Sequence, residues 1–107
     1  MSQEEFQALT STNFDEFIRD GSGIIICHKP QCPHCKIMKT VLGKLATMEP
    51  DLGIAAVDSI AEQELLKKME VERVPTLCVF KDGNIVARHS GVMNPTETLQ
   101  WYERAMQ

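Results

Sequence analysis

Short apolar runs rich in β-branched residues alternate along this sequence with longer segments whose apolar residues recur every three or four positions. This alternation predicts strands interleaved with helices, which pack as an α/β fold with some parallel strands. No linker, repeat or low-complexity stretch interrupts the pattern, so we expect a single domain over residues 1–107. The expected order is β-α-β-α-β-α-β-β-α, in which helices flank a central mixed sheet.

The strongest strand signal is Ile24–His28, which ends where Pro30 follows, because proline has no N–H to donate to a sheet. Two further strands, Leu77–Phe80 and Ile85–Ala87, flank Asp82-Gly83. An Asp-Gly pair between apolar runs is typical of a tight hairpin, so these strands should be antiparallel. Shorter strands are expected at residues 6–9 and 54–57.

The main helix should begin at Pro33, since six apolar residues after it are spaced to form one helical face. They are Ile37, Met38, Val41, Leu42, Leu45 and Met48. Ser59 and Glu62 have the spacing of a capping box for a helix ending near Met69. Asn94, followed by Pro95 and Glu97, predicts the start of a helix that runs to about Ala105.

Charge and hydropathy exclude several kinds of partner. The 11 Lys and Arg residues against 15 Asp and Glu give a formal charge of −4, and no basic block is present, which argues against a nucleic-acid or anionic membrane surface. The longest apolar run, Ile24–Cys27, is far below the roughly 20 residues that span a bilayer. Met1–Glu5 lacks the features of a secretory signal, so we expect a cytoplasmic protein, or a periplasmic one if a leader was removed. We also expect the protein to be a monomer.

The chemistry of the chain should lie in Cys32-Pro33-His34-Cys35, between a predicted strand and the main helix. Cys32 would then lie at or beside the helix N-cap, where unpaired N–H groups and a partial positive charge favour a thiolate. Two intervening residues let the sulfurs approach to disulfide distance, and Pro33 stiffens the turn. We expect the His34 ring to donate to the Cys32 thiolate or to place a positive charge near it.

A zinc site is the alternative for this motif. It would need ligands from Cys27, Cys78, His28 or His89, yet the sequence contains no second closely spaced pair. We therefore expect no metal, with Cys27 and Cys78 serving as small buried apolar residues. His28 and His89 are expected to be solvated surface groups.

Together these motifs resemble the thioredoxin family, from about residue 5 to 105. The resemblance is carried by the Cys-x-x-Cys junction, by Val74-Pro75-Thr76, by the Phe80–Gly83 hairpin and by Gly91. It implies a thioredoxin fold in which Cys32 attacks, Cys35 resolves the mixed disulfide, and a cis Pro75 faces the pair. It also implies that substrates bind at Arg73, Val74, Pro75 and Gly91, and that no cofactor is needed beyond the cysteine pair.

The chain departs from ordinary thioredoxins at the site itself. Pro33-His34 resembles the dipeptide of DsbA-type oxidases, which also tend to carry valine where Val74 stands, although the chain is too short for their helical insertion. Ile26 stands where thioredoxins commonly place a buried aspartate, and Ala56 stands near the position of that aspartate's charged partner, so the usual proton acceptor for Cys35 is missing. Glutaredoxins are a weaker match, because Arg73 and Ser90 replace two of the residues with which they grip glutathione.

We therefore expect an enzyme that exchanges thiols and disulfides with protein substrates through Cys32. A poise more oxidising than that of ordinary thioredoxin is expected, since the absent aspartate and His34 both favour the thiolate. A reductase like thioredoxin reductase is a candidate partner. The alternative function is a thioredoxin-fold binding module that holds a partner or metal while its cysteine pair is inert.

Overall fold

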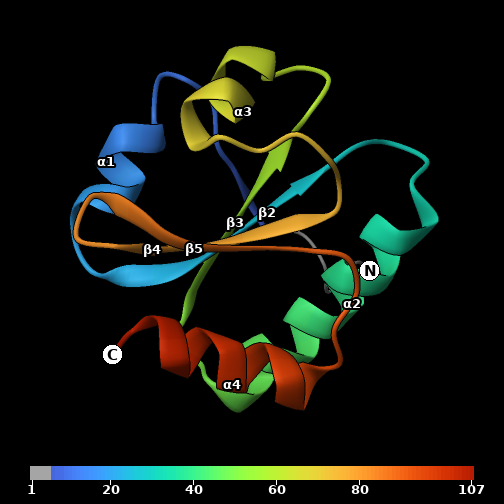
Figure 1. Ribbon diagram of the computed structural model, residues 1–107, viewed down its shortest axis with the longest axis vertical. Coiled ribbons are helices and arrows are strands. Elements are labelled where there is room, and N and C mark those ends of the chain that lie inside the picture. Colours follow the sequence, from blue (N-terminus) through green and yellow to red (C-terminus); the bar gives the residue numbers. More distant parts are fainter. Residues whose placement is uncertain (1–5) are drawn as a thin grey trace.

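The computed structural model describes residues 6–107, so the expectations for Met1–Glu5 lie outside the described residues. Within this range the predicted order of strands and helices is confirmed (Figure 1). The strands are β1 (Gln7–Ala8), β2 (Ser22–His28), β3 (Gly53–Asp58), β4 (Thr76–Lys81) and β5 (Asn84–Ser90). The helices are α1 (Phe14–Arg19), α2 (Pro33–Met48), α3 (Gln63–Met69) and α4 (Pro95–Ala105).

The five strands form one mixed sheet in the order β1-β3-β2-β4-β5. Strand β2 is central: it runs parallel to β3 and antiparallel to β4. Helices α1 and α3 cover one face of the sheet, and α2 and α4 cover the other (Figure 1). Because both faces are covered, five consecutive residues of β2 are buried, as expected for a strand that is apolar on both sides.

Alternate residues of β2 enter two separate cores. Ile25 and Cys27 pack with α1 and α3, whereas Ile24 and Ile26 pack against α2 and α4. Burying a side chain of this size stabilises the fold by about 1.5–3 kcal/mol relative to exposure. The central strand therefore fixes both helix layers, and it leads directly into the loop that precedes α2.

Helix α2 confirms most of its predicted apolar face. Met38, Leu42 and Leu45 are fully buried and Val41 is nearly so, but Ile37 and Met48 are 47% and 49% exposed. The prediction was wrong for these two, because Ile37 is turned about 100° around the helix from Met38 and Met48 lies in the last turn. Within the part of the chain that is described, no helix has both the length and the apolar character needed to cross a membrane.

Two local predictions are confirmed. The hairpin between β4 and β5 has positive φ at both Asp82 (49°) and Gly83 (90°). At the start of α4, the Asn94 side chain accepts from Glu97 N at 2.7 Å, and the Glu97 carboxylate accepts from Asn94 N at 3.2 Å.

The capping box predicted at Ser59 and Glu62 is wrong. Helix α3 begins after Glu62, which makes no side-chain capping bond. The carboxylate of Asp58 instead accepts the backbone N–H groups of Ile60 and Ala61 at 2.8 and 3.1 Å. An aspartate is well suited to such a bond two residues along the chain, so the turn forms around the end of β3 and delays the helix. The first strand is also shorter than expected, because only residues 7–8 form β1.

Candidate active site

Cys32 is the N-cap of α2, as its position between strand and helix predicts. Its backbone is extended (φ −106°, ψ 109°), and its sulfur accepts the backbone N–H of Cys35 at 3.3 Å. Gln31 reaches this position through a left-handed conformation (φ 61°), and Pro33 occupies the first turn, where its missing N–H costs nothing. The helix start therefore presents a backbone donor directly to the Cys32 sulfur.

The two sulfurs of the motif form a donor–acceptor pair. The pKa of Cys32 lies below its usual value chiefly because the Cys35 thiol donates a hydrogen bond to it, with further help from the Cys35 N–H and the Lys29 charge. Burial and, after it, the hydrogen bond that it donates to Cys32 together raise the pKa of Cys35 to about 11. Cys32 retains 8% exposure and Cys35 only 2%. The arrangement therefore favours a thiolate at Cys32 and a thiol at Cys35.

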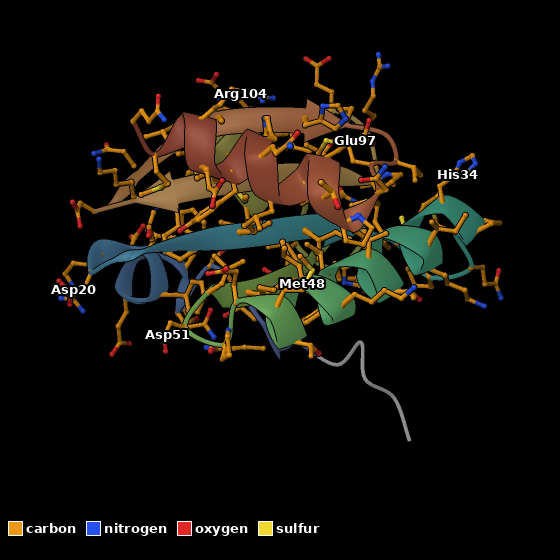
Figure 2. The ribbon with its side chains drawn as sticks, turned by 90° about the horizontal axis from the view of Figure 1, so that it is seen from below. Asp20, His34, Met48, Asp51, Glu97 and Arg104 are labelled. Carbon is orange, nitrogen blue, oxygen red and sulfur yellow. The ribbon has the colours of Figure 1, made fainter. Side chains whose placement is uncertain are left out.

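His34 acts on this pair through its backbone. Its N–H is among the groups that lower the pKa of Cys32. The side chain is exposed, and Figure 2 shows its imidazole at the tip of α2, directed away from the rest of the chain. The expected contact between the His34 ring and the Cys32 thiolate is thus not formed in this structure, and a role for the ring stays a prediction.

The loop before β4 lies beside the carboxyl end of β2, the same end of the sheet as the start of α2. Thr76 is paired with Cys27 of β2, so Pro75 lies next to the carboxyl end of the strand that leads to Cys32. The Val74–Pro75 peptide bond is cis, and Pro75 is buried. Its carbonyl accepts the N–H of Gly91 at 3.0 Å. Gly91 has φ 102°, which favours glycine, and it joins the loop after β5 to the Pro75 loop.

The other two residues of the predicted substrate surface differ in exposure. Arg73 is exposed, while Val74 is half-buried and packs against the core beneath α1 and α3. The Arg73 carbonyl accepts the Thr76 hydroxyl at 2.6 Å, which ties the loop to the start of β4. The backbone of residues 73–75 is therefore held in place, with one charged side chain available at its edge.

At the ends of β2 and β3 the structure places a pair of residues that the sequence analysis missed. Ile26 and Ala56 are buried in the apolar core as expected, so they supply no carboxylate there. His28, however, was wrongly expected to be solvated: it is partly buried, and burial followed by the charge of Lys39 lowers its pKa. Asp58 lies directly opposite His28 in the sheet. The signal in the sequence was the position of His28 and Asp58 at two strand ends.

Cys27 and Cys78 do not join the site. Both are fully buried in the core under α1 and α3, as predicted for small apolar residues. The Cys27 thiol has its pKa raised by a hydrogen bond with Cys78 and by burial. His89 is partly exposed at the surface, and its ring also packs against Trp101, with ring centroids 5.9 Å apart. Among residues 6–107, no cluster of three or more His, Cys, Asp or Glu side chains is arranged to hold a metal ion.

Comparison with known proteins decides the family. The family model described as Thioredoxin matches residues 5–104. The chain belongs to the thioredoxin family. It is 33% identical over 84 residues to a thioredoxin of Chlamydia pneumoniae, covering 78% of this chain and 82% of that protein. A solved structure of reduced desulfothioredoxin from Desulfovibrio vulgaris Hildenborough has a TM-score of 0.79 and 38% identity, and the match covers 92% of this chain and 96% of that one.

A second kind of relative is much longer. Protein disulfide-isomerase A4 of Bos taurus is 38% identical over 80 residues, which are 70% of this chain but 12% of the isomerase. The chain thus spans about an eighth of that protein. The thioredoxin fold is confirmed, and the thioredoxin family comprises thiol–disulfide oxidoreductases that use their own cysteine pair and no cofactor.

Proposed function

We propose that this thioredoxin-family protein exchanges a Cys32–Cys35 dithiol or disulfide with the cysteines of protein substrates. The observation that carries the proposal is the asymmetry of the pair: the Cys32 sulfur accepts hydrogen bonds at the start of α2, while the Cys35 thiol donates one. The thiolate is the nucleophile in disulfide exchange, so Cys32 makes the first attack. Cys35 then attacks the mixed disulfide and releases the reduced substrate.

The substrate should bind in an extended form beside Pro75. Backbone pairing at this loop would be a case of β-strand addition, in which main-chain hydrogen bonds supply much of the affinity. The bond between Gly91 N and Pro75 O supports this proposal, because it holds the two flanking loops together. Val74 and Arg73 would then contact substrate side chains.

The poise of the pair is proposed to be more oxidising than that of ordinary thioredoxin. A lowered pKa at Cys32 stabilises the reduced form, and Ile26 places no like charge near the thiolate. The Pro33-His34 dipeptide, which resembles that of DsbA, also favours a more oxidising potential. We therefore expect a potential between about −270 mV and about −120 mV, the values of thioredoxin and DsbA.

A trapping experiment tests the proposed activity. Cys35→Ser removes the resolving thiol, so a substrate attacked by Cys32 should stay covalently attached and can be identified by mass spectrometry. Cys32→Ser is the matched control and should trap nothing. If Cys35→Ser forms no reducible adduct while the unaltered chain holds a partner without a covalent bond, the proposal fails and the binding-module alternative is favoured.

A further inference from the structure

The resolving cysteine is poorly ionised in this site. Burial and the bond to Cys32 raise the pKa of Cys35 to about 11, and burial continues to oppose its ionisation once Cys32 is held in the mixed disulfide. Ile26 and Ala56 provide no ionisable side chain beneath it. Any group that stabilises negative charge on Cys35 would therefore accelerate the second step of exchange.

Lys39 is placed to do so. It follows Cys35 by four residues within α2, so both side chains lie on the same side of the helix, one turn apart. Of the three lysines of α2, Lys39 alone is partly buried, whereas Lys36 and Lys44 are exposed. The neighbouring residue Met38 packs on Ile26 in the core, which turns this part of the helix toward the sheet.

Two residues at the end of the sheet complete the group. His28 and Asp58 are the last residues of β2 and β3 and lie opposite each other in parallel register. They follow Ile26 and Ala56 by two positions, so they project from the same face of the sheet, toward α2. The bonds from Ile60 N and Ala61 N anchor the Asp58 carboxylate. A carboxylate, an imidazole and an ammonium group from three elements thus lie within electrostatic range of one another, and the ammonium group of Lys39 also acts on Cys35.

We propose that Lys39, held near Asp58 and His28, stabilises the negative charge that Cys35 carries while it attacks the mixed disulfide. In this step the Cys35 thiol gives its proton to water, and its sulfur forms a bond to Cys32 Sγ. The bond between Cys32 Sγ and the substrate sulfur breaks. The substrate sulfur leaves with the electron pair and takes up a proton from water. The substrate is reduced by two electrons, and the Cys32–Cys35 pair is oxidised.

The electrostatics of the surrounding groups agree with this role. Against burial and the bond to Cys32, the backbone N–H of Lys29 and the charge of Lys39 both act to lower the pKa of Cys35. Burial would raise the pKa of Asp58, but its two backbone bonds and the charges of His28 and Lys39 hold it below its usual value. Asp58 therefore stays ionised at neutral pH and balances the Lys39 charge, which lowers the cost of keeping an ammonium group partly buried.

The inference rests on the proposed function. A reaction with one phase for each cysteine shows which of the two is wrong if either fails. Reduced protein is mixed with one equivalent of dithiobis(nitrobenzoate) in a stopped-flow instrument. Attack by Cys32 releases the first thionitrobenzoate, and attack by Cys35 on the mixed disulfide releases the second. The variants are Lys39→Gln, Lys39→Arg as the rescue that keeps the charge, and Lys36→Gln as the matched control on the exposed side of α2.

We expect Lys39→Gln to slow the second phase about three- to tenfold at neutral pH and to shift its pH profile upward, because losing the cation raises the pKa of Cys35 and lowers its thiolate fraction. The rate of the first phase should be the same in all variants as in the unaltered chain. The rate of the second phase should be unchanged in Lys39→Arg and in Lys36→Gln. An unchanged second phase in Lys39→Gln, or an equal slowing in Lys36→Gln, would overturn the inference while leaving the proposed function intact. Absence of the first phase would overturn the proposed function itself.

Discussion

The chain holds two pairs of cysteines, each joined by a hydrogen bond between thiols, yet the pairs differ in almost every other respect. Cys32 and Cys35 lie at the start of α2, just beyond the carboxyl end of the central strand β2. Cys27 and Cys78 lie on adjacent strands in the middle of the sheet and have no exposed surface. We therefore expect only the Cys32–Cys35 pair to carry out disulfide exchange, although both pairs have a thiol-to-thiol contact.

The difference arises from the backbone around each pair. A helix start leaves several N–H groups without a partner, so they can stabilise a thiolate at the N-cap. In the centre of a sheet the N–H groups are already paired with neighbouring strands, so no backbone donor remains for a buried sulfur. The hydrogen bond that the Cys27 thiol donates to Cys78, followed by burial, raises the pKa of Cys27, whereas the same bond lowers the pKa of Cys78.

The largest expected effect concerns removal of one cysteine from each pair. Cys32→Ser should lower disulfide exchange by roughly a thousandfold or more, because a serine hydroxyl cannot form the mixed disulfide. Cys78→Ala should retain the exchange activity. Reduction of insulin in the presence of dithiothreitol measures both, and a comparable loss of activity in Cys78→Ala would show that the buried pair takes part.

Alkylation of the reduced native chain should separate the pairs by at least about a hundredfold in rate, since only Cys32 combines thiolate character with access to solvent. Iodoacetamide at mildly acidic pH, followed by peptide mass spectrometry, should find Cys32 modified first. Cys27 and Cys78 should react only when the chain opens, and therefore at a rate that increases with added urea. Early labelling of Cys27 in the folded chain would contradict the comparison.

Much of this comparison could be predicted from the sequence. The position of the Cys-x-x-Cys motif between a β-branched run and an amphipathic segment indicated that Cys32 caps a helix. The apolar neighbours of Cys27 and Cys78 indicated burial. Such features depend on local periodicity and capping chemistry, which operate over a few residues.

The remaining features depend on register and side-chain direction. His28 and Asp58 come together only because β2 and β3 pair in parallel with these two residues opposite each other, and a one-residue slip would separate them. The His34 ring points outward because of its side-chain rotamer. The spacing of the Cys-x-x-Cys motif does not determine that rotamer. The capping box predicted at Ser59 and Glu62 does not form, because the Asp58 carboxylate accepts the backbone N–H groups of Ile60 and Ala61 in the turn before α3.

Replacement of a cysteine by serine should affect stability much more in the buried pair than in the pair at the start of α2. Cys78→Ser places a hydroxyl in an apolar core and should lower the free energy of unfolding by about 1–3 kcal/mol. Cys32→Ser places serine at a helix N-cap, a favoured position for it, and should change stability by no more than about 0.5 kcal/mol. Urea denaturation of the reduced variants tests this, and equal losses at both positions would mean that the N-cap of α2 gains nothing from its acceptor.

The smallest expected effect concerns the His34 side chain. Because the ring points away from Cys32 and the backbone N–H supplies the contact, His34→Gly should shift the potential toward more reducing values by about 20 mV, which corresponds to about 1 kcal/mol for two electrons. His34→Ala separates the ring from the added backbone freedom of glycine, which itself weakens the first turn of the helix. Equilibration of each variant against glutathione measures the oxidised fraction. A shift several times larger in both variants would show that the ring reaches the thiolate in the reduced protein, and that side-chain charge, rather than the helix start, distinguishes the reactive pair from the buried one.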